Sequence, residues 1–107
     1  MAGKFNNRKV FYDGHKFDSM KERDVYIRLK NDPMVKDIVL QPPFILLDAF
    51  EKDGQKYRPI KYIADFDVTY IDGRREIIDA KGFITPEFKL KAKLFDSRYR
   101  DLTLVIE

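Results

Sequence analysis

Apolar and polar residues alternate with a period of two along much of the chain, which predicts several strands. Two short strands, at 10–12 and 15–17, flank Asp13-Gly14, a dipeptide typical of tight hairpin turns. A break is expected near Pro59, because proline cannot donate a hydrogen bond to a neighbouring strand. The longer strand candidates are residues 35–41, 44–50, 56–70 and an apolar segment expected to be buried, 102–106.

Two segments repeat their apolar residues at helical spacing instead. The first helix is expected from Ser19 to about Lys30, where Asn31-Asp32-Pro33 ends it. The second opens at Thr85-Pro86-Glu87, which offers an N-cap, a proline at the first position and an acid in the first turn. It should end near Tyr99. Together with the strands, these helices predict a mixed α/β fold in which a central mixed sheet is flanked by helices.

The expected hairpin between residues 62–70 and 75–81 has two possible registers, and the apolar pattern separates them. A three-residue loop, Ile71-Asp72-Gly73 with Gly73 left-handed, sets Phe66 opposite Ile78 and keeps one face apolar. A two-residue loop would mix apolar and polar side chains on both faces. The three-residue loop is therefore the predicted one.

This register also sets Asp65 directly across from Asp79, with Lys81 on the same face. Two like charges in this position destabilise a sheet unless a cation lies between them. Magnesium takes one or two carboxylates and keeps several waters, and a nearby lysine stabilises charge that builds up on a phosphate. The pattern indicates metal-assisted hydrolysis of a phosphodiester. The alternative is a simple surface ion pair between Lys81 and one of the aspartates.

Glu22 shares with Val25, Tyr26 and Leu29 the helix face that is expected to pack inward. A carboxylate in such a position is costly unless it is paired or bound to a metal. Alternatively, Ser19-Met20-Lys21-Glu22 is a capping box, in which Glu22 reaches back to the Ser19 amide. Both interpretations stay open, and both can hold in part.

Basic residues are concentrated in two segments, although the net charge is only +3. Residues 1–17 and 81–100 are both locally positive, and residues 1–9 are expected to form a flexible basic arm. Lysines on these segments can neutralise DNA phosphates and release counterions, although a solvated surface explains them equally well. The candidate DNA contacts are Arg8, Lys9, Lys89 and Lys93.

The composition excludes several classes of protein. The chain has no cysteine, so it has no disulfide, thiol nucleophile or cysteine zinc site, and this fits a reducing compartment. No apolar run approaches the ~20 residues of a membrane helix, and the first residues do not resemble a secretion signal. We expect one cytoplasmic domain spanning residues 1–107, with no membrane partner.

Four segments of the chain, YDGHKFDSMKE, LQPPF, YIADF and DAKGF, resemble small phage and prophage endonucleases related to Holliday-junction resolvases. These belong to the PD-(D/E)xK nuclease superfamily. Asp65 matches the first aspartate of that motif, with Ala64 in place of the proline, and Asp79 and Lys81 match its second part. Glu22 matches an acid that many members supply from the preceding helix.

The resemblance covers about residues 10–105 and implies a restriction-endonuclease-like core with Mg²⁺ or Mn²⁺ as cofactor. It implies that Glu22, Asp65 and Asp79 hold the metal and that Lys81 completes the catalytic set. It also implies a homodimer that cuts branched or duplex DNA during phage DNA recombination or processing, in the host cytoplasm if the protein is phage-encoded. The alternative is a DNA- or partner-binding module that keeps the nuclease fold without turnover.

Overall fold

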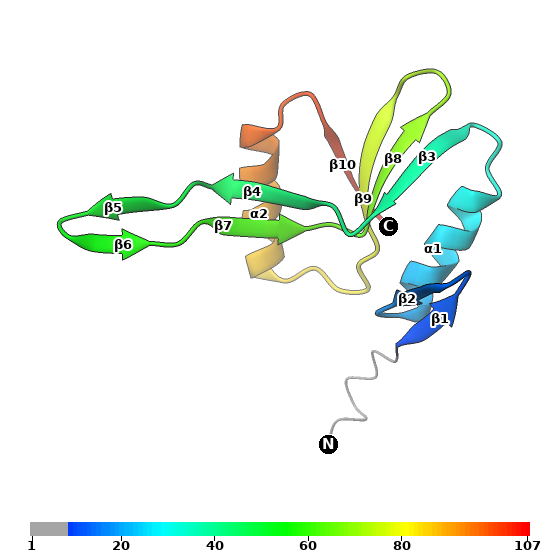
Figure 1. The fold of residues 1–107 in the computed structure, drawn as a ribbon, viewed down its shortest axis with the longest axis horizontal. Coiled ribbons are helices and arrows are strands. Elements are labelled where there is room, and N and C mark those ends of the chain that lie inside the picture. The colour runs from blue at the N-terminus through cyan, green and yellow to red at the C-terminus, as the bar shows by residue number, and fades with distance from the viewer. Residues whose placement is uncertain (1–8) are drawn as a thin grey trace.

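The structure is a computed structural model that describes residues 9–107, within which two helices and ten short strands are formed (Figure 1). The expected basic arm lies outside the described residues, apart from Lys9. The elements are β1 (Val10–Tyr12), β2 (His15–Phe17), α1 (Met20–Lys30), β3 (Val35–Leu40), β4 (Pro43–Leu47), β5 (Phe50–Lys52), β6 (Gln55–Tyr57), β7 (Ile60–Ile63), β8 (Phe66–Tyr70), β9 (Arg75–Asp79), α2 (Pro86–Arg98) and β10 (Thr103–Ile106).

Both helices begin and end where their capping signals predict. Ser19 is the N-cap of α1, and its hydroxyl accepts a hydrogen bond from the Glu22 amide at 3.1 Å. Thr85 caps α2 in the same way, through the Phe88 amide at 3.0 Å. The predicted helices are confirmed to within a residue at each end.

The main sheet has four strands in the order β10-β9-β8-β3, and it is mixed because only β10 runs parallel to its neighbour. The mixed α/β prediction is confirmed at this level. β10 was expected to be a buried strand, but it lies at the edge of the sheet and its side chains are exposed or only half-buried. An edge strand has one neighbour in the sheet, so one side of it stays open.

The β8–β9 hairpin has the predicted register. Phe66 lies opposite Ile78, and the Tyr70 amide donates to the Arg74 carbonyl at 2.8 Å, which closes a three-residue loop. Gly73 has a φ of 92°, in the region that favours glycine. The loop prediction is confirmed, including the left-handed glycine.

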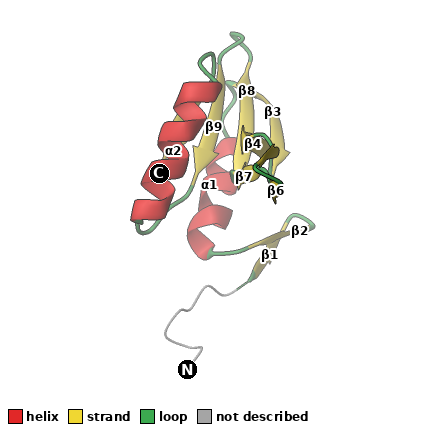
Figure 2. Cartoon of the chain, turned by 90° about the vertical axis from the view of Figure 1, so that its left-hand side faces the viewer, coloured by secondary structure: helices red, strands yellow, loops and turns green. Residues whose placement is uncertain are grey.

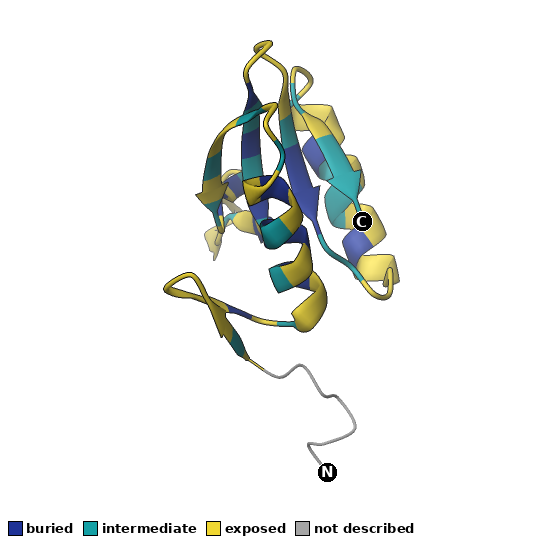
Figure 3. Ribbon diagram, turned by 90° about the vertical axis from the view of Figure 1, so that its right-hand side faces the viewer, coloured by how far each residue is buried: buried dark blue, intermediate teal, exposed yellow. Residues whose placement is uncertain are grey.

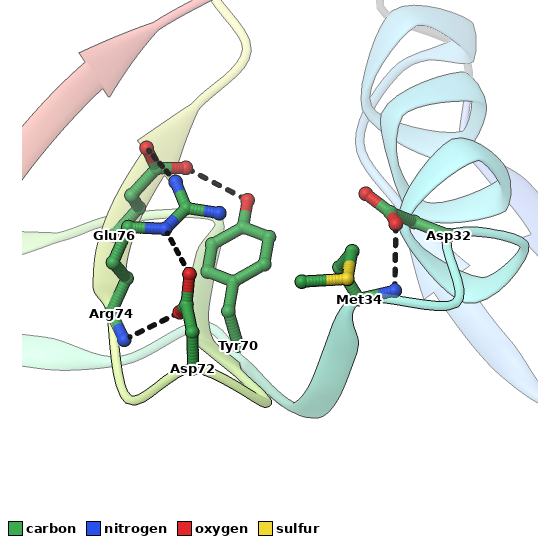
Figure 4. Close-up of polar contacts among 6 residues, drawn as sticks. All are labelled: Asp32, Met34, Tyr70, Asp72, Arg74 and Glu76. Carbon is green, nitrogen blue, oxygen red and sulfur yellow. Dashed lines mark hydrogen bonds and ion pairs between the residues drawn. The ribbon is translucent and has the colours of Figure 1, made fainter.

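Side chains on both sides of this loop hold it closed (Figure 4). The Asp72 carboxylate accepts from the Arg74 amide and from its guanidinium, both at 3.0 Å. These bonds lower the pKa of Asp72. The guanidinium also lies 4.3 Å from the Tyr70 ring centroid, and the Tyr70 hydroxyl donates to Glu76 at 2.8 Å. The loop therefore fixes the register on which the far end of the hairpin depends.

The predicted strand 62–70 is not continuous, and residues 43–63 leave the main sheet as a two-stranded ribbon (Figure 1). We call these residues the ribbon. It is a continuation of the β3–β8 pairing in the same register, because Leu40 lies opposite Phe66 and Pro43 lies opposite Ile63. The predicted strand 44–50 is also divided, into β4 and β5, because the pairing shifts at a bulge beyond Ile45.

Helices cover opposite faces of the main sheet (Figure 2), and β8 and β9 between them are the most deeply buried strands (Figure 3). The core on the α1 side consists of Phe17, Val25, Tyr26, Leu29, Phe66, Val68, Tyr70 and Ile78. The core on the α2 side also includes the base of the ribbon, and consists of Phe44, Leu46, Tyr62, Ala64, Ile77, Phe88 and Phe95. Within residues 9–107, neither helix is long and apolar enough to cross a membrane.

Candidate active site

The four residues predicted to form a site line one hollow of about 250 Å³, together with Asp18, Ser19 and Ala80. They come from three separate parts of the fold. Glu22 lies in the first turn of α1, Asp65 at the bend between β7 and β8, and Asp79 and Lys81 at the end of β9. The structure therefore brings these four side chains together from distant parts of the sequence.

Asp65 is positioned by the bend at which the ribbon leaves the sheet. The Gln41 amide donates to the Asp65 carbonyl at 3.0 Å, and the Asp65 amide donates to Ile78 at 3.2 Å. The carboxylate Oδ2 accepts from the Ala80 amide at 2.7 Å. The regular β8–β9 pairing ends at Phe66, so Asp65 is not a simple cross-strand partner of Asp79 as the pattern predicted. The bend turns its side chain along β9 instead.

Asp79 is only 3% exposed and is held by two neighbours. The Tyr62 hydroxyl donates to its Oδ2, and the Lys81 Nζ lies 3.6 Å from its Oδ1. Glu107 pairs with the backbone on both sides of Ala80, donating to the Asp79 carbonyl and accepting from the Lys81 amide, both at 3.0 Å. The chain after β10 therefore fixes the Asp-Ala-Lys segment in an extended conformation.

Lys81 is half-buried and forms the ion pair with Asp79 that the alternative interpretation predicted, although Asp79 is buried and the pair is therefore not a simple surface pair. Its Nζ lies 4.7 Å from the centroid of the Phe88 ring as well as beside Asp79. The Lys21 side chain donates to the Lys81 carbonyl at 2.9 Å. The Lys81 ammonium group therefore lies between the buried carboxylate of Asp79 and the face of the Phe88 ring, at the edge of the hollow.

Glu22 is 5% exposed, which is unusual for a carboxylate. Burial raises its pKa, and the charges of Asp18 and Asp79 add to this, while hydrogen bonds with Asp65 and with the Asp18 backbone act in the opposite direction. Half of the predicted capping box is formed, because Ser19 accepts from the Glu22 amide. The other half, a bond from the Ser19 amide to the Glu22 carboxylate, is not among the hydrogen bonds of the described residues, and this carboxylate instead lies in the hollow with the aspartates.

Burial and the neighbouring carboxylates both act on Asp65. Burial, followed by the charges of Asp79 and Glu22, raises the pKa of Asp65 to about 8, although the bond from Ala80 lowers it. Four carboxylates, those of Asp18, Glu22, Asp65 and Asp79, therefore share one hollow with a single lysine on its wall. Such an arrangement favours either protonation of one carboxylate or the presence of a cation.

The donor set fits a hard divalent cation. Carboxylate oxygens are the ligands of Mg²⁺ and Mn²⁺, and magnesium needs only one or two of them beside water. In the part of the chain that the structure describes, no three His, Cys, Asp or Glu side chains already have the arrangement of a metal centre. Asp65 and Asp79 instead use oxygens to accept from Ala80 and Tyr62. Each of these bonds uses only the Oδ2 of its carboxylate, so the Oδ1 atoms and the second lone pairs of the Oδ2 atoms remain as acceptor sites for a metal.

Sequence reasoning missed three residues next to the site. A second hollow, of about 220 Å³, lies on the other side of Lys81 and is lined by Tyr62, Phe88 and Lys91, among others. In the sequence, Tyr62 gives no signal beyond that of an ordinary strand residue. A tyrosine in an apolar strand usually needs a polar partner when it is buried, but the identity of that partner depends on where the ribbon folds back.

The basic residues predicted to contact DNA have different surroundings. Arg8 lies outside the described residues. Lys9 forms an exposed ion pair with Asp18 at 2.6 Å, close to the carboxylates. Lys89 and Lys93 are exposed on α2, as both the phosphate-binding and the solvated-surface interpretations require. Neither Lys89 nor Lys93 lines either hollow, whereas Lys91 lines the second one.

Comparison with known proteins assigns a family without an activity. A family described as a protein of unknown function (DUF1064) matches residues 2–107. The chain belongs to the DUF1064 family. No curated protein and no solved structure matches it. Membership of DUF1064 covers the whole of both cores and the hollow, and the resemblance to the PD-(D/E)xK nucleases remains a prediction.

Proposed function

We propose that the protein is a metal-dependent endodeoxyribonuclease with a restriction-endonuclease-like core. One observation carries the proposal: Glu22, Asp65, Asp79 and Lys81 come from separate elements and line the same hollow. The two most buried charged side chains of the described chain, Glu22 and Asp79, are both members of this set. Buried, mutually repelling carboxylates destabilise a fold, and their convergence on one lysine is typical of a functional site.

Each residue has a role that follows from its surroundings. Mg²⁺ or Mn²⁺ would supply an activated water and polarise the phosphate. Asp65 and Asp79 would hold the cation, with Glu22 as a further ligand from α1. Lys81 would place a positive charge against the phosphate, and its contacts with Asp79 and Phe88 restrict where that charge can lie. Tyr62 would keep Asp79 in one orientation by donating to its Oδ2.

The substrate class, assembly and location rest on the family resemblance. It favours branched DNA of the Holliday-junction type, with duplex DNA as the other substrate. A homodimer would supply two sites for symmetric cuts. The process would be phage DNA recombination or processing, in the cytoplasm of a host cell if the protein is phage-encoded.

A non-catalytic DNA- or partner-binding module is the second candidate. The observation that favours it is that the carboxylates of the described chain are not already arranged as a metal centre. In this case the hollow would be closed by internal bonds such as Tyr62 to Asp79, and turnover would be absent.

Cleavage of labelled four-way junctions and matching linear duplexes tests the proposal, in Mg²⁺, Mn²⁺ and EDTA. We expect metal-dependent cutting by the wild type, and a loss of about a hundredfold or more for Asp65→Ala and Lys81→Ala. Lys36→Ala is a matched control, because Lys36 is exposed on β3 and does not line either hollow beside Lys81. Undiminished cutting by Asp65→Ala would exclude the assigned site, and bound but uncut DNA would favour the binding module.

A further inference from the structure

Four cationic side chains of the ribbon have no ion-pair partner within the described chain. None of the ion pairs among residues 9–107 involves any of these four cations. The ribbon carries three carboxylates, Asp48, Glu51 and Asp53, against these four cations, so its formal net charge is +1. Asp48 pairs at 3.0 Å with Arg98, which lies outside the ribbon. The four cations are Lys52, Lys56, Arg58 and Lys61.

The outer part of the ribbon also exposes aromatic surface. Phe50 and Tyr57 lie opposite each other, with ring centroids 4.6 Å apart and an angle of 14° between the rings. They are 46% and 45% exposed, even though they stack. Lys52 follows Phe50 on the same face of the ribbon, and Lys56 and Arg58 lie on the other face. Exposed aromatic and cationic side chains that alternate in this way mark an interaction surface.

The charge decides between the two partners that such a surface suits. A second copy of this chain would place one positively charged ribbon against another, and like charges across an interface are unfavourable. DNA presents the complementary charge, about one phosphate for every 1.7 Å of duplex axis. The major groove is wide enough to admit a two-stranded ribbon. Duplex DNA is therefore the partner that the ribbon fits.

The ribbon is connected directly to the candidate site. Its two strands continue the β3–β8 pairing without a change of register, across the bend at which Asp65 lies. Tyr62, on strand β7 of the ribbon, donates to Asp79. Gly54, at the tip, lies nine positions before Ile63 at the base of the ribbon, so at ~3.3 Å per residue the tip lies roughly 30 Å from that base. This length corresponds to about nine base pairs of duplex.

We propose that the ribbon is a DNA-binding element, which lies along the duplex on one side of the cut and contacts phosphates up to about nine base pairs from it. The inference rests on the proposed nuclease function for the position of the cut, although not for the binding itself. Phe50, Tyr57 and Lys52 face the floor of the groove, and the long side chains of Lys56 and Arg58, on the other face, reach the phosphates along its edges. The ribbon thereby sets the length of duplex that the site requires.

Binding of a labelled 30-base-pair duplex to the full chain tests this, by fluorescence anisotropy in EDTA and in Ca²⁺ at several salt concentrations. The ribbon variant is Lys52→Ala/Lys56→Ala/Arg58→Ala. Its matched control, Arg23→Ala/Lys30→Ala/Lys36→Ala, removes the same charge from positions on α1 and β3 that lie outside both basic segments. We expect the ribbon variant to bind at least about tenfold more weakly and to lose two to three units of salt slope. The control should stay within about threefold of the wild type.

Cleavage and assembly measurements separate the possible outcomes. Wild-type cutting with equal binding by the two triple variants would overturn the ribbon proposal and leave the nuclease intact. Ribbon-dependent binding without cutting in any metal would support the ribbon and contradict the nuclease. If Phe50→Ala/Tyr57→Ala dissociates a dimer in sedimentation but binds DNA normally, the ribbon is a self-association surface and the proposal is wrong. Melting curves confirm that each variant is folded.

Discussion

Asp79 illustrates how single residues define this site. Its carboxylate is buried between a hydroxyl that donates to one oxygen and an ammonium group 3.6 Å from the other. Burial, with the hydrogen bond to Asp79 and the charge of that carboxylate, raises the pKa of Tyr62. The tyrosine therefore stays protonated and remains a donor at neutral pH. The orientation of Asp79 depends on a residue from the ribbon.

Tyr62→Phe removes this donor and keeps the ring. A hydrogen bond to a charged group contributes about 1.5–3 kcal/mol, so we expect the free energy of unfolding in EDTA to fall by about that amount. Urea denaturation measures it. Tyr12→Phe is the control, because Tyr12 is 43% exposed, and its effect should stay within about 0.5 kcal/mol. An equally small effect of Tyr62→Phe would show that the bond does not hold Asp79 in solution.

The residues of the site differ in how far the sequence reveals them. Asp65, Asp79 and Lys81 are visible because their charges interrupt an apolar hairpin pattern, and Glu22 because it interrupts an apolar helix face. Tyr62 gives no such signal, since a tyrosine is an ordinary residue in a strand. Its role arises only from the packing of β7 against α2 and β9.

At the scale of elements, the loop at residues 71–73 fixes the register of β8 against β9. Gly73 has a φ of 92°, and a Cβ added there meets no atom within 4 Å. Gly73→Ala is therefore a test of backbone strain without a steric clash. We expect it to lower the free energy of unfolding by about 1 kcal/mol.

Gly82→Ala is the matched control for this prediction. A Cβ at Gly82 also meets no atom within 4 Å, and Gly82 does not have a positive φ. The control should be neutral or slightly stabilising, because alanine reduces the entropy of the unfolded chain. Equal effects of the two substitutions in urea denaturation would contradict the role assigned to the loop.

Elements set by local signals could be predicted, and those set by distant pairing could not. Both helices follow from caps at Ser19 and Thr85, and the hairpin follows from the apolar alternation that ends at Gly73. The ribbon depends on two separate bends that coincide, at Gln41 and Asp65. The edge position of β10 depends on its pairing with β9. Neither the two coinciding bends nor the pairing of β10 with β9 leaves a pattern in the sequence of its own segment.

In the molecule as a whole, the carboxylates lie where α1, the main sheet and the ribbon meet. Asp65 faces Glu22 and Asp18 from the α1 side, Asp79 and Lys81 from β9, and Tyr62 from the ribbon. The raised pKa of Asp65 means that the folded protein holds a proton which the unfolded chain releases. This stabilises the metal-free protein fully below the unfolded pKa, near 4, and the contribution is lost as the pH rises to about 8.

Asp65→Asn keeps the shape of the side chain and removes this titration. In EDTA we expect the variant to be more stable than the wild type at pH 8, by about 0.5–2 kcal/mol, and the difference to shrink towards pH 4. Comparing the two proteins cancels the titration of the carboxylates outside the hollow, whereas the titration of Glu22 changes together with that of Asp65. Saturating Mg²⁺ or Mn²⁺ should reverse the order at pH 8, because a cation bound to the native state stabilises only the protein that keeps its ligand. Melting curves from pH 4.5 to 8.5, with and without metal, measure both effects. If the variant is more stable in EDTA and stays equally more stable in metal, the carboxylates repel one another but do not bind a cation. This result would favour the non-catalytic module.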